Sequence, residues 1–483
     1  MSLRRIDPRF TLPAAPKRAV VLGDLDEWRN GLPEVGVEVA DAGTTRADLV
    51  VAPATLARAV AALEPTALIV EGRSDRILEA AGYDVRHFLP RPTLEEPSLL
   101  VPLEQPLAAS YAVRHWSIVD RRWKRWRSRV AAALLERGRS IPWQPTLTVA
   151  TRHAGAPYIV AAAAQQLQLP APDQWVLTLG QGDALSRNVL HAFPPDDETP
   201  AWVVKFARVP GYAEPFDRDE RGLGLAARAG EVVARRAPRL LGRFVVDSVH
   251  ASVETAAVGI RLRELLQTPR SGDAARRLVD QVTGWILELG RATAEPPEAL
   301  AEERRRLAEE VIPRWSAHGV TAALVSELPP LPAVTQHNDL GSWNVIVDGR
   351  SFTTLDWESA RARGLPLWDL LYFLADALAV LDGAVRGEDR HEHTRRLFRG
   401  DLSSSEILFA WVRRAVAAFE VPHDSVGRIA TLCWLHHSLS HVDRSDRRAR
   451  LGDSSPPRAH GVERMAETWL SDPALGTSWV RWC

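Results

Sequence analysis

Short apolar runs alternate with helix-like segments along roughly the first 107 residues. Continuous apolar runs of this length are typical of strands whose two faces are both covered. We expect strands at Ala19–Gly23, Ala47–Ala52, Thr66–Val70 and Tyr83–Phe88, and helices at Ala54–Leu63 and Ser74–Ala81. Strands that alternate with helices predict a small parallel α/β domain over residues 1–110.

The pattern changes after Thr146. Three apolar runs divided by short polar turns predict an antiparallel meander, at Trp175–Leu179, Asn188–Phe193 and Trp202–Ala207. A helical stretch follows at Asp219–Arg236. Two further strand-like runs lie at Arg243–Val249 and Ala251–Ala257. These elements predict a β-rich lobe over residues 145–258.

Helical periodicity dominates beyond Gly259. The expected helices are Ala274–Thr293, Glu298–His318, Leu367–Leu381 and Ser404–Phe419. We therefore expect a helical lobe over residues 259–483 and a cleft near Val253–Gly259, where the β-rich lobe ends.

Residues 111–144 connect these regions and carry nine arginines and lysines against two acids, Asp120 and Glu136. A helix is predicted over 115–137, with one apolar face made by Val119, Trp123, Trp126, Val130 and Leu134. Such a helix can bind a membrane surface or a polyanion through residues 119–134. We favour the alternative, a connecting helix whose tryptophans pack between domains and whose arginines are solvated.

Composition excludes several classes of protein. The chain has 483 residues, of which 46% are hydrophobic and 25% charged, as in soluble globular proteins. No apolar run approaches the roughly 18 residues of a membrane-spanning helix, and the N-terminal residues lack the apolar segment of a secretory signal. Two cysteines, Cys433 and Cys483, cannot form a disulfide framework or a zinc site by themselves. We expect a cytoplasmic protein.

The segment QHNDLGSWNVIV, which begins at Gln336, carries the strongest chemical pattern. The runs after Asn344 and before Asp356 predict a short hairpin that turns at Asp348-Gly349. Asn344 and Asp356 would then lie at neighbouring ends of paired strands.

This arrangement is suited to phosphoryl transfer. That reaction needs a carboxylate near the attacking hydroxyl and hard oxygen ligands for Mg²⁺. We expect Asp339 to orient and deprotonate the hydroxyl, and Asn344 and Asp356 to hold the magnesium ion.

The same residues resemble the aminoglycoside phosphotransferase and choline kinase-like family, which shares the protein-kinase fold. The family's H-x-D-x-x-x-x-N pattern matches His337, Asp339 and Asn344, and its I-D-W/F-E segment resembles the LDWE run that contains Asp356. Asp369, followed by Leu370, matches a later D-L pair. The resemblance covers the chain from about Thr146 to the C-terminus.

The resemblance implies an α+β fold of two lobes, with a small antiparallel β lobe and a larger helical lobe. It also implies ATP or another nucleoside triphosphate as the donor, Mg²⁺ as the metal, and catalytic roles for Asp339 and His337. Asn338 and the Gly341-Ser342-Trp343 run depart from the family pattern beside the acceptor site, and leave the substrate open.

Lys205 is the only lysine after residue 124 in a chain with 60 basic residues, nearly all arginine. A compact ammonium suits contact with phosphates, and a guanidinium does not simply replace it. The resemblance makes Lys205 the third-strand lysine of the kinase fold, with Glu220 as its expected carboxylate partner and Glu231 as a weaker candidate. The alternative is a solvated lysine on an edge strand.

The loop between the first two strands of the meander contains Gly180, Gly182 and Ser186. Glycines and small polar residues let backbone N–H groups approach phosphates. A G-x-G pair alone is more often a simple turn, but this one lies two strands before the lysine. Ser186 and Arg187 are further candidates for phosphate contact, and the adenine is expected near the backbone of Val253 and Thr255.

The first domain lacks the glycine loop of dinucleotide-binding proteins, because Asp24-Leu25-Asp26 follows its first strand. The segment from Ala47 to Gly72, with the AAGYD run after it, resembles a shortened, degenerate class I methyltransferase domain, which implies a Rossmann-like fold. Methyl transfer by this domain is the least favoured of the functions considered.

We therefore expect an ATP-dependent phosphotransferase that acts on a hydroxyl of a small molecule such as a sugar, an aminoglycoside or an amino alcohol. The helical lobe has no dense acidic run, so a sugar suits the acceptor site at least as well as a cationic antibiotic. The alternative is a catalytically weak, kinase-like nucleotide-binding scaffold that docks through the basic helix. No nucleic-acid partner is expected, and His436, His437 and His441 are interpreted as helix surface or core rather than a metal site.

Overall fold

The computed structural model describes residues 3–41, 47–116, 122–137, 146–268, 272–349, 351–384, 387–450, 464–477 and 479. The chain divides into two compact units. The first contains the described residues up to Phe216 together with Arg239–Val258. The second contains Asp217–Pro238 and most of the described chain from Gly259 onward.

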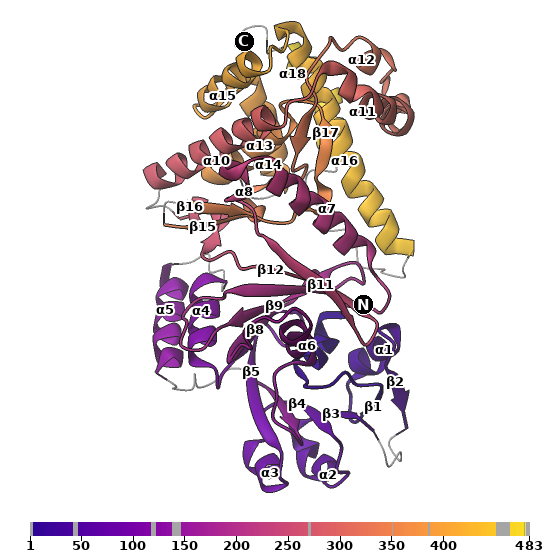
Figure 1. Ribbon diagram of the computed structural model, residues 1–483, viewed down its shortest axis with the longest axis vertical. Coiled ribbons are helices and arrows are strands. Elements are labelled where there is room, and N and C mark those ends of the chain that lie inside the picture. Colours follow the sequence, from indigo (N-terminus) through magenta and orange to yellow (C-terminus); the bar gives the residue numbers. More distant parts are fainter. Residues whose placement is uncertain are drawn as a thin grey trace. The chain divides into compact units, whose positions relative to one another are not determined.

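The first unit is built on one mixed sheet, which has 12 strands in the described part of the chain (Figure 1). In spatial order these are β11 (Leu240–Val246), β12 (Val249–Thr255), β10 (Trp202–Ala207), β9 (Arg187–Phe193), β8 (Gln174–Thr178), β6 (Pro97–Pro102), β5 (Asp84–Pro92), β7 (Leu147–Thr151), β4 (Ala67–Glu71), β3 (Leu49–Pro53), β1 (Arg18–Val21) and β2 (Glu38–Ala40).

The N-terminal strands form the expected parallel arrangement. β1 pairs in parallel with β2 and β3, and β3 with β4. One insertion was not expected. Strand β7 lies between β4 and β5 and is antiparallel to both, so β4 and β5 run in the same direction without pairing.

The two regions predicted as separate domains, 1–110 and 145–258, share this sheet. Strand β6 pairs antiparallel with β5 on one side and with β8, the first strand of the predicted meander, on the other. The meander itself is confirmed, because β8, β9 and β10 are successive antiparallel neighbours. The joining has a physical reason, since an open strand edge is a liability that pairing removes.

Helices cover both faces of the sheet, which explains the continuous apolar runs of its strands. One face carries a single apolar cluster under a 3-10 helix (Leu3–Thr11), α1 (Asp26–Glu34) and α6 (Tyr158–Gln166). The other face carries two clusters. One lies under α2 (Ala57–Ala61) and α3 (Asp75–Ala80), and the other under α4 (Pro106–His115) and α5 (Arg122–Glu136).

Within the predicted helix 115–137, the described chain forms α5, and α4 ends before it at His115. Helices α4 and α5 lie side by side, and Arg114 pairs with Glu136 between them (Figure 1). Helix α5 packs through Ala132 and Leu135, whereas Trp126 is 67% exposed. The expectation that the tryptophans pack between domains is therefore wrong for Trp126. Val119 and the side chain of Trp123 lie outside the described residues.

The second unit is mainly helical. Its helices are α7 (Glu214–Arg228, which begins in the first unit), α8 (Glu231–Ala234), α9 (Leu262–Leu266), α10 (Gly272–Ala292), α11 (Ala301–Arg306), α12 (Ala323–Ser326), α13 (Trp368–Leu381), α14 (Gly387–Arg399), α15 (Ser405–Ala418), α16 (Val426–Arg450), α17 (Met465–Leu470) and α18 (Pro473–Thr477). Two small sheets accompany them, β13 (Ile260–Arg261) with β15 (Val345–Asp348) and β16 (Ser351–Thr354), and β14 (Val334–Gln336) with β17 (Arg361–Gly364).

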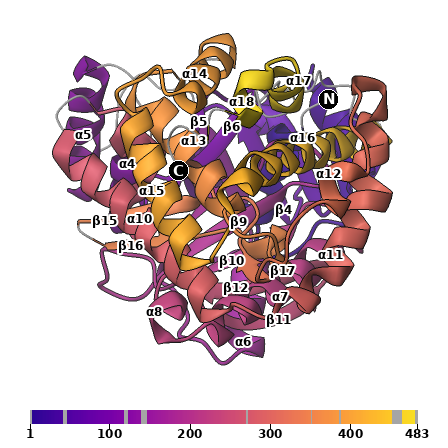
Figure 2. The same cartoon turned by 90° about the horizontal axis from the view of Figure 1, so that it is seen from above.

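Helix α13 lies at the centre of the second unit and is buried from Trp368 to Val380. Helices α10, α14, α15 and α16 pack against it (Figure 2). A helix that is apolar around its whole circumference belongs in a core, so the two acids within it, Asp369 and Asp376, stand out. No helix in the described ranges is both long and apolar enough to span a membrane.

Buried charges tie the N-terminal 3-10 helix to the sheet. Asp7 is fully buried and accepts hydrogen bonds from Arg208 Nε, at 2.9 and 3.1 Å, and from Arg9 at 3.1 Å. Arg9 also donates to the Arg208 carbonyl at 2.8 Å. One carboxylate thus accepts hydrogen bonds from two buried guanidinium groups.

We expect Asp7→Asn to lower the free energy of unfolding by about 3–5 kcal/mol, because it removes the buried carboxylate that both guanidinium groups contact. Urea denaturation followed by tryptophan fluorescence measures the effect. Glu38→Gln is the matched control, since it removes an exposed pair with Arg18 and should cost less than about 1 kcal/mol. Equal effects of the two substitutions would contradict the prediction.

Candidate active site

The loop that contains Asp339 is held by two carboxylates of α13. Asp369 accepts the backbone N–H of His337 at 2.6 Å and of Asn338 at 2.8 Å. Asp376 accepts both the backbone N–H, at 2.7 Å, and the hydroxyl of Ser342. The two acids are seven residues apart, which is two helical turns, so they share one face of α13.

Burial raises the pKa of Asp369 to about 6, while the two N–H groups that it accepts oppose the shift. Around neutral pH the group is therefore an anion, and the anion accepts these hydrogen bonds more strongly than the acid. From the sequence, Asp369 was noted only for the D-L pair that it forms with Leu370. In the structure it anchors the loop.

Asn338 adopts a left-handed backbone conformation, with φ of 64°. Glycine and asparagine tolerate this region best, so an asparagine suits this position. Its side-chain oxygen lies 3.2 Å from His436 Nε2, and His436 stacks on Trp368.

The histidines of α16 belong to the core. His436 and His437 are buried, and His437 stacks on Tyr372 at 4.1 Å between ring centres. Over the residues that the structure describes, no group of three or more His, Cys, Asp or Glu side chains is placed to hold a metal. Of the two predicted alternatives, helix surface or core, these two histidines are core, while the side chain of His441 lies outside the described set.

His337 is fully buried against Trp357, with 4.7 Å between the ring centres. Its Nε2 lies 2.9 Å from the carbonyl oxygen of Leu355, so this nitrogen carries the proton and donates it. Burial lowers the pKa of His337 to about 4 despite that bond and the nearby Asp356 carboxylate. The imidazole is therefore neutral and ties the loop to the residue before Asp356.

Asp339 is half-buried and lies between two polar neighbours. Asn344 Nδ2 donates to the Asp339 carbonyl at 2.9 Å and approaches its carboxylate at 3.3 Å. The Tyr372 hydroxyl donates to Asp339 Oδ1 over 3.5 Å. Burial first, and then the Asp339 charge, raise the pKa of Tyr372 well above its usual value, so the phenol stays protonated and can only donate here.

The predicted hairpin is present. Val345 pairs with Thr354, and Leu355 N–H donates to the Asn344 carbonyl at 2.7 Å. This register places Asn344 and Asp356 at the same end of the hairpin. Since Asn344 commits its amide nitrogen to Asp339, its amide oxygen is the atom that can act as a ligand.

An amide oxygen beside a carboxylate suits Mg²⁺, which usually takes one or two protein ligands and fills its octahedron with phosphate oxygens and water. The donor set of Asn344 and Asp356 therefore fits magnesium bound together with a nucleotide. It does not fit a closed, protein-only metal site.

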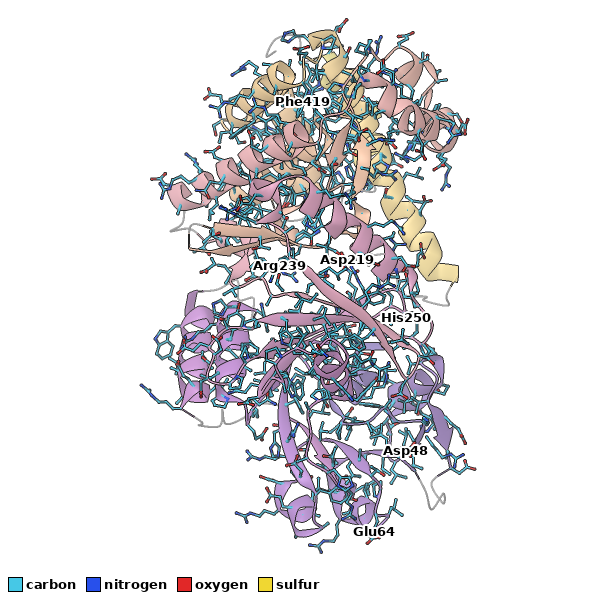
Figure 3. The ribbon with its side chains drawn as sticks, in the orientation of Figure 1. Asp48, Glu64, Asp219, Arg239, His250 and Phe419 are labelled. Atoms are coloured by element: carbon cyan, nitrogen blue, oxygen red, sulfur yellow. The ribbon has the colours of Figure 1, made fainter. Side chains whose placement is uncertain are left out.

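Helix α7 packs directly on the turn after Asp356. A Cβ atom on Gly222 would lie 2.0 Å from the carbonyl oxygen of Trp357, so only glycine allows this approach. The buried acid of α7 is Asp219, labelled in Figure 3, which is 1% exposed and acts on the charge of His337.

The two acids predicted to partner the lysine are both on the surface. Glu220 is exposed, and Glu231 is exposed and pairs with Arg235 along α8. Helical periodicity could have placed Asp219 on the buried face of α7. Phe216, Leu223 and Ala226 are buried at helical spacing from it, whereas Glu220 lies off that face.

In the first unit, Lys205 lies on β10, which is paired on both sides, so it is not an edge-strand residue. Its side chain is 12% exposed and forms an ion pair of 2.7 Å with Glu254 of β12. Glu254 is a partner that the sequence pattern did not indicate. Its position diagonal to Lys205 depends on strand register, which the local pattern does not specify.

The 180–186 loop is held mainly through its carbonyl groups. Arg4 donates to the Gly180 carbonyl at 2.5 Å, and Leu3 N–H to the Gly182 carbonyl at 2.8 Å. Arg208 donates to the Asp183 carbonyl. The N–H of Gly180 itself donates to the Asn188 side chain at 3.1 Å, so Gly180 shapes the loop and offers no free donor.

Gly182 adopts a φ of 92°, which favours glycine. Ser186 is buried, and its N–H donates to the Asp183 carbonyl at 3.2 Å. The N–H groups of Gly180 and Ser186 are therefore both engaged within the first unit.

The backbone around Val253 and Thr255 is engaged in the sheet. Val253 is a core residue whose strand pairs with both neighbours, and Thr255 N–H donates to the Arg239 carbonyl at 3.0 Å. The Val253 backbone and the Thr255 N–H are therefore already engaged and do not supply the contacts expected for adenine. Beyond the strand, the Ala256 N–H donates to the Ala201 carbonyl, and Ala257 and Val258 follow.

Comparison with known proteins gives only distant similarity. No protein-family model and no curated protein sequence matches the chain. Among solved structures, the aminoglycoside phosphotransferase APH(3'')-Id from Streptomyces rimosus is 16% identical, with 57% of this chain and 95% of that one covered and a TM-score of 0.35.

A glucosamine kinase is 14% identical over 61% of this chain and 84% of that one, with a TM-score of 0.34. The bifunctional kinase-methyltransferase WbdD is 13% identical over 87% and 88%, with a TM-score of 0.25. Similarity at this level assigns neither a fold nor an activity to this chain.

We expect Gly222→Ala to destabilise the second unit by about 1–3 kcal/mol, because the added methyl group forces α7 away from the Trp357 carbonyl. Thermal denaturation measures the change. Gly224→Ala is the control on the same helix. There the nearest atom is the flexible end of Arg228, so the higher helix propensity of alanine should leave stability unchanged or raise it by up to about 1 kcal/mol. Equal losses from both would refute the argument.

The stability that His337 contributes should decrease as the pH is lowered. The unfolded imidazole takes up a proton near pH 6.5 and the folded one only near pH 4, so between these values the unfolded state binds more protons. From pH 7.5 to pH 5 the wild type should therefore lose about 2 kcal/mol relative to His337→Gln, which does not titrate. Urea denaturation at both pH values measures this, and the exposed His423, changed to Gln, is the control. A parallel pH profile of wild type and His337→Gln would show the argument to be wrong.

Proposed function

We propose that this protein is an ATP-dependent phosphotransferase that phosphorylates a hydroxyl group of a small molecule, with a two-lobed kinase-like architecture from about residue 145 onward. One observation carries the proposal. Asp339, Asn344 and Asp356 are brought together on one anchored loop and hairpin, with the Asn344 amide nitrogen committed to Asp339.

Asp339 is assigned to the acceptor hydroxyl, which it orients and from which it accepts the proton. Its carboxylate is held by Tyr372 and Asn344, so it is aimed before substrate binds. His337 positions the loop instead of exchanging protons, because it is buried and bonded to Leu355. This replaces the catalytic role expected for it.

Magnesium is assigned to Asn344 Oδ1 and the Asp356 carboxylate. When bound, the ion neutralises charge on the donor phosphates. The chain's own contribution is the hairpin register, which sets the two ligands side by side, and Gly222, which fixes α7 against the turn that follows Asp356.

The phosphates of the nucleotide are assigned to Lys205 and to the N–H groups between Gly180 and Ser186. Carbonyl groups on this loop are held by Leu3, Arg4 and Arg208, which favours N–H groups for ligand contact. The base is assigned to the backbone of Ala257 and Val258, beyond the strand ladder. ATP or another nucleoside triphosphate is the donor.

A second candidate is a nucleotide-binding scaffold that docks through α5. The exposed Trp126 on this basic helix favours it. The two candidates differ in one measurable respect, since a scaffold binds nucleotide without consuming it in the presence of any acceptor.

We expect Asp339→Asn to reduce turnover by about 10²–10⁴-fold, because the amide cannot accept the hydroxyl proton. Phosphate transfer from ATP with Mg²⁺ to a panel of hydroxylated metabolites measures the effect. Nucleotide binding should persist in this variant, since Asp339 is not assigned to the donor.

Asp348→Asn is the matched control, an exposed acid at the turn of the same hairpin, and it should retain turnover. Turnover of Asp339→Asn within a few fold of the wild type would overturn the assignment of Asp339. Nucleotide binding with no consumption by the wild-type protein would favour the scaffold.

A further inference from the structure

A positively charged cluster lies beside the loop that carries Asp339, and neither the loop nor the proposed magnesium site uses it. Arg390 of α14 pairs with Asp376 and lies 5.9 Å from the ring centre of Trp343. Trp343 packs edge-to-face on Tyr372, and Tyr372 donates to Asp339. Arg390 is therefore connected to the proposed base through two aromatic side chains.

Arg263 brings a second cation to the same place. It lies on α9, which packs against both α13 and the Ser342–Asn344 turn. Its side chain is half-buried, yet within the described ranges it forms no hydrogen bond or ion pair. Burial lowers the pKa of Arg263, while Asp376 opposes that shift and Arg390 adds to it.

The acids nearby do not balance these cations. Asp376 already accepts from the Ser342 N–H and hydroxyl and from Arg390. Glu264 is next to Arg263 on α9, but burial raises its pKa to about 7, so its negative charge is only partly present at neutral pH. Asp389 is exposed on α14. Apart from Asp339 itself, these described groups therefore carry net positive charge.

A half-buried guanidinium without an anion is costly unless a ligand supplies one, and its planar fork matches a carboxylate or phosphate. The half-exposed indole of Trp343 adds a flat apolar surface between these cations and Asp339. Charge and shape thus favour a hydroxylated ring that carries an anionic group.

We propose that the acceptor is an anionic hydroxylated molecule, such as a sugar acid or a sugar phosphate, whose negative group binds Arg263 and Arg390 beside Trp343. The inference rests on the proposed function for its reaction but not for its binding. A cationic acceptor would meet like charge at this cluster.

Equilibrium titration of the full-length protein, loaded with ADP and Mg²⁺, tests the proposal with four sugars that share one ring: glucuronate, glucose 6-phosphate, glucose and glucosamine. At least one anionic sugar should bind about tenfold or more tightly than glucose, and glucosamine should bind most weakly. Whichever of glucuronate and glucose 6-phosphate binds more tightly shows whether the site takes a carboxylate or a phosphate.

Arg263→Gln should reduce the preference for the anionic sugar over glucose by about 10- to 100-fold. Because Arg263 has no partner in the described chain, the Tm of the Arg263→Gln variant should equal or exceed that of the wild type. Arg277→Gln, which removes an exposed arginine of α10, should keep the preference.

Equal or tighter binding of glucose or glucosamine, or an unchanged preference in Arg263→Gln, would overturn the proposal. If no sugar binds, titration with inorganic phosphate decides: binding that Arg263→Gln loses supports the site, and absence of binding overturns it. Arg263-dependent anion binding without phosphate transfer to any acceptor would leave this site standing and contradict the proposed function. Phosphate transfer to neutral sugars without any anion preference would support the proposed function and contradict this anion site.

Discussion

Hydrogen bonds from the loop backbone to two carboxylates of a buried helix hold the candidate site together. Asp369 takes two N–H groups at one end of the loop, and Asp376 takes one at Ser342. A buried N–H that loses its partner costs about 1–3 kcal/mol, so the loop is fixed at both ends. Asp339 lies between these anchors, and its position is set by α13 before any ligand binds.

The same helix arranges the charges around the site. Its two anions lie in a core otherwise built from apolar and aromatic side chains, where the histidines at positions 337 and 436 are neutral because burial lowers their pKa values. Asp376 pairs with Arg390 and accepts from Ser342, whereas Arg263 forms no ion pair within the described residues. A structural anchor for the loop thus also sets the charge of the neighbouring surface.

The N-terminal region is part of the first unit's framework. Its strands join the meander through β6 and β8, and its 3-10 helix contacts the glycine-containing loop through Leu3 and Arg4. The buried Asp7 and Arg208 pair stabilises that contact. A region interpreted from sequence as a degenerate, separate domain therefore supports the loop assigned to the nucleotide phosphates.

The sequence by itself determined the local elements: the strands of the meander, the β15–β16 hairpin, helices α10, α13 and α15 of the second unit, and the grouping of Asp339, Asn344 and Asp356. These follow from periodicities of 2 and 3.6 and from turn residues, which act between chain neighbours. Only the tertiary structure decided that β7 enters between β4 and β5, that Glu254 pairs with Lys205, and that Asp219 is the buried acid of α7. Strand pairing, register and the packed face of a helix depend on contacts between distant segments, which no local pattern contains.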